Sequence, residues 1–147
     1  MTLVYADTSA LARAYLTDEV GHEQLRTLLF ESDYRVVTSE LARIELASAI
    51  VSASRTGRTP GWEEVLATME ADTGPAGMIA LIALRRELIL PAALRLVAEH
   101  RLRTLDAIHL AVAMEEGPRL AAGDEIQFVT LDRDQAAAAR ALGLTVR

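Results

Sequence analysis

Residues 3–16 read LVYADTSALARAYL, and this stretch decides the expected fold. The continuous apolar run at 3–6 predicts a short buried strand. Asp7, Thr8 and Ser9 follow directly and supply three candidate N-cap residues for a helix over 10–16. A buried strand therefore turns straight into a helix, and the side chains at this turn lie at the carboxyl end of the strand.

The rest of the chain continues the alternation of strands and helices. Strands are expected at 34–37, 78–84, 127–131 and 144–146, and helices at 22–30, 40–54, 62–69, 87–100, 105–115 and 135–142. Thr38, Ser39 and Thr104 are expected as helix caps, Pro91 in a first helical turn, and Gly117-Pro118 as a helix end. This order predicts an α/β fold: a three-layer α/β/α sandwich with a mostly parallel central sheet. No repeat or linker divides residues 1–147, so we expect a single domain.

Composition excludes several classes of protein. The chain of 147 residues has no cysteine, which rules out disulfides, thiolate zinc sites and a cysteine nucleophile. No run reaches the ~18 apolar residues of a membrane span, and the N-terminal apolar stretch is too short for a signal peptide, so we expect a cytoplasmic protein. The net charge of -6 argues at first against a nucleic-acid partner, although every basic residue is arginine, which suits phosphate contact.

Four acidic residues are the strongest functional signal in the chain. Asp7 and Asp132 follow expected strands, whereas Glu45 and Asp106 lie on apolar faces of expected helices. Carboxylates that share a cleft repel each other by about a few kcal/mol at an effective dielectric constant of ~20, unless a cation lies among them. Without these four charges the net charge falls from -6 to -2. The pattern therefore favours a site for a hard divalent cation.

Two of these acids also have simpler explanations. Asp7 can cap the following helix, although its two hydroxyl neighbours could do the same. Glu45 points into a stripe whose other members are small or apolar apart from Ser48, and burial there requires a partner. An ion pair with Arg43 or Arg13 is the alternative to a metal site.

The other two acids leave similar alternatives open. Asp106 lies in a first helical turn, where the helix dipole favours any negative charge. His109 on the same face is better explained as a hydrogen-bonded structural histidine than as a metal ligand. Asp132 and Asp134 can each act as a turn or cap residue, and Asp132 is favoured because it is nearer to the strand end.

At four places the sequence resembles one known family. The matching segments are DTSAL at 7–11, SELARIEL at 39–46, LRTLDAIHLA at 102–111 and FVTLD at 128–132. They resemble the ordered motifs of PIN-domain ribonucleases and, within them, the VapC-like toxins of bacterial toxin–antitoxin pairs. The resemblance implies a three-layer α/β fold, endoribonuclease activity with Mg²⁺ or Mn²⁺, and a homodimer held inactive by a cognate antitoxin. An RNA substrate is implied by this resemblance alone.

The resemblance also implies roles for particular residues. Its acidic quartet falls on Asp7, Glu45, Asp106 and Asp132, with Ser9 and Thr130 as polar support and Asp134 as a competitor for the fourth position. We expect Asp7 and Asp106 to be the central metal ligands, and Asp132 and Glu45 to bind a second ion or hold the attacking water. The nearest arginines in sequence, which are candidates for phosphate contact, are Arg13, Arg43, Arg101 and Arg103.

Other protein classes fit less well. Receiver domains and P-loop nucleotide binders need a lysine, and this chain has none. An aspartyl phosphatase would want a second aspartate where Ser9 stands. A PIN-like domain that has lost catalysis and acts as a binding module remains the main alternative. Partner surfaces are open too: apolar residues such as Leu11, Tyr15, Leu25 and Leu29, and the apolar face of the helix at 41–51, could serve a dimer, an antitoxin peptide or ordinary core packing.

Overall fold

A five-stranded parallel sheet forms the centre of the molecule. The computed structural model describes residues 1–57 and 60–147. The strands are β1 (Leu3–Ala6), β2 (Arg35–Ser39), β3 (Ile79–Ile82), β4 (Ile126–Val129) and β5 (Thr145–Val146). They lie in the order β3-β2-β1-β4-β5, and every pair of neighbours is parallel. The expected mostly parallel sheet is therefore confirmed.

The first strand of the chain lies in the middle of this sheet. All four residues of β1 are buried, as a strand covered on both faces requires. Tyr5 pairs with Phe128 of β4, and their rings stack with centroids 5.4 Å apart. This contact joins two strands that are more than 100 residues apart in sequence.

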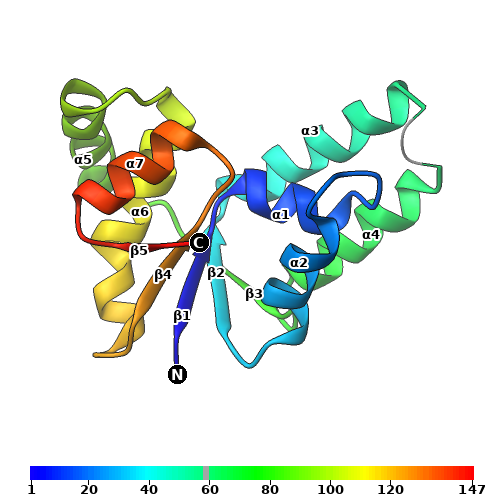
Figure 1. The fold of residues 1–147 in the computed structure, drawn as a ribbon, viewed down its shortest axis with the longest axis horizontal. Coiled ribbons are helices and arrows are strands. Elements are labelled where there is room, and N and C mark those ends of the chain that lie inside the picture. Colours follow the sequence, from blue (N-terminus) through cyan, green and yellow to red (C-terminus); the bar gives the residue numbers. More distant parts are fainter. Residues whose placement is uncertain (58–59) are drawn as a thin grey trace.

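Helices cover both faces of the sheet, which gives the expected three layers. The helices are α1 (Thr8–Tyr15), α2 (His22–Arg26), the π-helix η1 (Thr27–Glu31), α3 (Leu41–Arg55), α4 (Trp62–Asp72), α5 (Arg86–Glu99), α6 (Thr104–Ala121) and α7 (Arg133–Ala141). Figure 1 shows α5, α6 and α7 on one side of the sheet and α1 to α4 on the other. Each side has its own apolar core: Leu3 and Tyr5 point into the first, Val4 and Ala6 into the second.

Both proline predictions were wrong. We expected Gly117-Pro118 to end the helix, but α6 continues through both residues to Ala121. Pro91 lies well inside α5 rather than in its first turn. Proline removes one backbone hydrogen bond at such a position, and tertiary packing offsets this loss. In α6 the flanking residue Glu116 is buried and forms ion pairs with two arginines.

Three of the expected helix caps, Thr38, Ser39 and Thr104, differ from those observed. Ser39 and Thr38 belong to β2, and α3 begins only after Glu40, although the Ser39 hydroxyl accepts a hydrogen bond from the Leu41 amide. Thr104 is the first helical residue of α6, not its cap. The predicted strand at 127–131 ends at Val129, so Asp132 follows it at a short distance and caps α7.

The apolar residues considered for a partner surface are mostly core. Leu11, Tyr15 and Leu29 are buried in the core between the sheet and the helices α1 to α4, and Leu25 packs against this core. Core packing, one of the open alternatives, therefore accounts for these residues. None of the helices in the described part of the chain has the length and apolar character that crossing a membrane requires.

Candidate active site

Asp7 lies at the carboxyl end of the central strand and is almost completely buried. Its Oδ1 accepts hydrogen bonds from the Ser9 hydroxyl at 2.6 Å and the Ala10 amide at 3.2 Å. Its Oδ2 accepts one from the Thr130 hydroxyl at 3.1 Å. Asp7 thus caps α1, as one of its two explanations requires, and it also faces the residues that follow β4.

Thr130 and Gln135 connect Asp7 with the start of α7. The Thr130 hydroxyl lies 2.6 Å from Oε1 of Gln135 and accepts a hydrogen bond from the Asp132 amide at 3.0 Å. Gln135 donates from its backbone to Oδ1 of Asp132 at 2.7 Å and from its side chain to the Asp106 carbonyl at 3.1 Å. These hydrogen bonds between buried polar groups hold Asp7 and Asp132 in a fixed position relative to the edge of the sheet.

A cation already stands between Asp106 and Asp132. Nε of Arg103 lies 3.4 Å from Oδ2 of Asp106, and another nitrogen of its guanidinium lies 3.7 Å from Oδ2 of Asp132. The Arg103 side chain is 85% exposed, whereas the two carboxylates are mostly covered. These carboxylates are therefore close enough together to share one positive charge.

Glu45 joins the group through a histidine. Its Oε1 lies 2.7 Å from Nε2 of His109, which belongs to α6 one turn beyond Asp106. The ion pair with Arg13 or Arg43 that we considered for Glu45 is not formed: Arg13 pairs with Glu19, and Arg43 is exposed. His109 is 2% exposed and hydrogen-bonded at both ring nitrogens, which confirms its prediction as a hydrogen-bonded histidine.

The electrostatics of the site oppose the burial of negative charge. Burial is the main cause that raises the pKa of Asp7, and the hydrogen bonds from Ser9 and Ala10 offset part of the effect. Burial also raises the pKa of Asp106, and the negative charge of Asp132 raises it further. A group whose carboxylates are harder to ionise than usual gains stability when a cation neutralises it.

The donor set fits a hard divalent cation chemically. Glu45 and Asp106 line one hollow of about 440 Å³ together with Arg103, Thr104 and Leu105. Across residues 1–57 and 60–147, no three acidic or histidine side chains stand close enough to one another to bind a metal as they are oriented. The guanidinium of Arg103 instead supplies the positive charge, and all donors around it are carboxylate oxygens of the kind that Mg²⁺ and Mn²⁺ prefer.

Several candidates lie away from this group. Asp134 is exposed in the first turn of α7, whereas Asp132 is the acid that contacts Arg103. Arg13 donates to the carbonyl of Val20 and is engaged in the loop after α1. Of the arginines expected near the site, only Arg103 contacts a quartet member in the described part of the chain.

Gln135 and Tyr5 belong to the site but were missed in the sequence. Gln135 is completely buried although it is polar, and Tyr5 lies in an otherwise aliphatic strand. The sequence signal that could have identified Gln135 is its position three residues after Asp132, the residue that caps α7. For Tyr5 it was a hydroxyl in a strand too buried to leave it unpaired.

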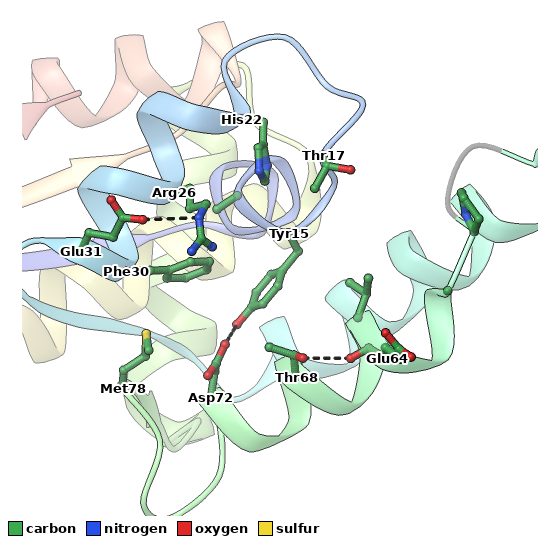
Figure 2. Close-up of a pocket in the computed structure, with 14 residues that line it drawn as sticks. Tyr15, Thr17, His22, Arg26, Phe30, Glu31, Glu64, Thr68, Asp72 and Met78 are labelled. Carbon is green, nitrogen blue, oxygen red and sulfur yellow. Dashed lines mark hydrogen bonds and ion pairs between the residues drawn. The ribbon is translucent and has the colours of Figure 1, made fainter.

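A larger hollow lies between α1, α2, η1 and α4. Its volume is about 710 Å³, and Figure 2 shows the side chains around it. The Tyr15 hydroxyl donates to Asp72 at 2.7 Å across this hollow, and Arg26 pairs with Glu31 at 3.4 Å. Glu64 adds a further carboxylate. None of the four candidate acids lines it.

Comparison with known proteins gives one result that covers nearly the whole chain. A family model described as PIN domain matches residues 4–141. No curated protein matches the sequence. The matched range includes all four acids, Arg103 and the hydroxyl residues beside Asp7.

Proposed function

Because this chain belongs to the PIN-domain family, whose members are generally nucleases, we propose that it is a metal-dependent endoribonuclease. The observation that carries the proposal is the convergence of acids from separate segments. Asp7, Asp106 and Asp132 are joined through Thr130, Gln135 and Arg103, and Glu45 reaches α6 through His109. Proteins bury ionised carboxylates together at a cost, and a metal site is a strong reason for it.

The residues divide the work between binding and positioning. Asp7, Asp106 and Asp132 would hold a Mg²⁺ or Mn²⁺ ion, with Ser9 and Thr130 fixing Asp7. When bound, the ion would lower the pKa of a water molecule and neutralise negative charge that develops on the phosphoryl oxygens. Glu45 lines the same hollow as Asp106 and would orient the attacking water. Arg103, displaced from the two aspartates by the metal, would contact a phosphate of the RNA.

A cleavage assay tests this proposal. Single-stranded RNA and DNA of the same sequence are incubated with the protein in Mg²⁺, in Mn²⁺ and in EDTA. We expect cleavage of RNA only, with metal only, and a loss of at least about 100-fold for Asp106→Asn. The matched control is Asp134→Asn, which removes the same charge from an exposed position. Cleavage by Asp106→Asn at the wild-type rate would refute the scheme.

One observation favours the catalytically inactive alternative. Among the described residues, no three acidic or histidine side chains are grouped closely enough to bind a metal. A PIN-like domain that only binds RNA or protein does not require such a group. In that case the protein retains RNA in a filter-binding assay, with or without metal, but never cleaves it. The same set of incubations therefore separates the two functions.

We further propose that the protein is a VapC-like toxin of a type II toxin–antitoxin pair, active in the cytoplasm. The segment LRTLDAIHLA at 102–111 supports this assignment. The net charge of -6, and the carboxylates around the hollow between α1 and α4, favour an antitoxin with a basic segment. Expression should arrest growth in the wild type but not in Asp106→Asn. Co-expression with a small basic protein from the neighbouring gene should yield a complex.

A homodimer is the expected assembly. Leu90, Leu94 and Val97 of α5 lie on one helix face and are 47%, 70% and 43% exposed. An apolar stripe of this kind favours contact with a second copy of the chain. Sedimentation should give a dimer for the wild type and a monomer for Leu94→Asp, and a wild-type monomer would contradict the proposal.

A further inference from the structure

His109 is buried at the junction of four elements, and both its ring nitrogens are engaged. Nδ1 lies 2.8 Å from the Tyr5 hydroxyl of β1. Nε2 lies 2.7 Å from Oε1 of Glu45 in α3 and 3.2 Å from the Thr8 hydroxyl in α1. The imidazole therefore joins α6 to the central strand and to the two helices that follow β1 and β2.

The chemistry of the partners determines the direction of each hydrogen bond. The Ser39 amide donates to the Tyr5 hydroxyl at 3.2 Å, so this hydroxyl can give its own proton to Nδ1 of His109. An ionised carboxylate only accepts, so Nε2 carries the hydrogen that points to Glu45. The chain of donors thus runs from Ser39 through Tyr5 and His109 to Glu45, with Nδ1 of His109 as the acceptor and Nε2 as the donor.

Without this bond, little in the structure would hold the Glu45 carboxylate. Its side chain is 22% exposed, and no other hydrogen bond or ion pair to its carboxylate is found in the described part of the chain. A glutamate on a helix can turn toward water through three side-chain torsions. His109 lies three residues after Asp106 on the same face of α6, so its bond to Glu45 brings that carboxylate toward Asp106.

We propose that His109 is a positioning residue, which acts by holding the Glu45 carboxylate at the hollow that Asp106 lines. This inference rests on the proposed nuclease function and goes beyond it, because it assigns the orientation of one acid to a residue outside the quartet. The alternative is a purely structural role, through the edge-on packing of His109 against the Tyr5 ring at a centroid distance of 5.9 Å.

A double-mutant cycle distinguishes these roles. The proteins are the wild type, His109→Leu, Glu45→Ala and the double variant, each measured for kcat, KM, Mn²⁺ affinity by calorimetry and unfolding in urea. We expect His109→Leu to lower kcat by about 10- to 100-fold, the range for loss of a residue that orients a functional side chain at a metal site, with little change in KM. In the Glu45→Ala background it should have no further effect on kcat, although it should still lower stability there, because the contact of His109 with Tyr5 is lost in either background.

Two further variants keep the test sharp if His109→Leu does not fold. In His109→Gln the side-chain amide reaches the position of Nε2 and can still donate to Glu45. In His109→Asn the amide reaches only the position of Nδ1. The first should retain most of the wild-type kcat, and the second should lose as much as His109→Leu.

Each outcome decides the question. Equal activity of the Gln and Asn variants, or an undiminished effect of His109→Leu on kcat in the Glu45→Ala background, overturns the positioning role. A wild type that cleaves RNA, together with an inactive Asp106→Asn, leaves the nuclease proposal standing in that event. A wild type that neither binds Mn²⁺ nor cleaves RNA overturns both.

Discussion

Replacement of Arg103 by alanine should strengthen metal binding and weaken RNA binding at once. Its guanidinium lies 3.4 Å from Asp106 and 3.7 Å from Asp132, so a cation that binds these carboxylates must displace it from both. Exposed ion pairs contribute about 0.2–1 kcal/mol each, so the two together contribute about 0.4–2 kcal/mol. Loss of this competition corresponds to about 2- to 30-fold tighter binding of Mn²⁺.

The effect on RNA should have the opposite sign. If Arg103 contacts a phosphate once the metal has released it, Arg103→Ala loses one such contact. The apparent affinity for RNA should then fall, and its dependence on salt should weaken by about 0.7 in a plot of log affinity against log salt concentration.

Calorimetric titration with Mn²⁺ and fluorescence binding of a short RNA measure the two effects. Arg101→Ala is the matched control, because it removes the same charge from an exposed position two residues away. Both of its affinities should stay close to those of the wild type. Unchanged or weaker binding of Mn²⁺ by Arg103→Ala would refute the competition between guanidinium and metal.

Three further predictions concern stability. Burial and Asp132 raise the pKa of Asp106 above its ordinary value of 3.8, so its ionisation destabilises the fold increasingly as pH rises past that value. Asp106→Asn should therefore raise the melting temperature, measured in EDTA, by a few degrees at pH 7 and hardly at pH 4, whereas Asp134→Asn should not. Hydrogen bonding from Arg85 lowers the pKa of Glu116, so its contribution is present at neutral pH and is lost as the pH falls below the ordinary 4.5; melting of Glu116→Gln should differ from the wild type more at pH 7 than at pH 4. A methyl group at Gly77 would overlap the backbone carbonyl of Asp72, so Gly77→Ala should lower the free energy of unfolding in urea by about 3 kcal/mol or more. In Gly117→Ala the added group meets only the flexible side chain of Ile126 at 3.3 Å, and the change should stay below about 1 kcal/mol.

Local sequence patterns were sufficient to predict the alternation of strands and helices and the layered sheet. Buried strands of a parallel sheet are continuous apolar runs, and residues 3–6 have this form. The patterns failed where distant contacts decide. Proline disfavours the interior of a helix because it lacks a backbone N–H, which is why a helix end was predicted at Pro118. In the structure α6 continues through Pro118 and packs on both β1 and α5. The π-helix η1 after α2 left no signal in the apolar spacing of residues 22–30.

The acids could be found from the sequence, whereas their partners could not. Asp7 and Asp132 stand at strand ends, where a parallel sheet brings residues together. The contact of Glu45 with His109 depends on the order of the strands, because α3 follows β2 and α6 precedes β4, and both strands flank β1. The position of Arg103 between two aspartates depends on side-chain torsions that no spacing rule describes.

The position of β1 has a consequence for biosynthesis. A ribosome makes β1 before the other four strands of the described sheet, and its neighbour β4 begins only at Ile126. Until that late segment emerges, one side of β1 has no partner and Asp7 lacks the Thr130 hydroxyl. The nascent polypeptide therefore cannot assemble the carboxylate group until the segment from β4 to Asp132 has been translated.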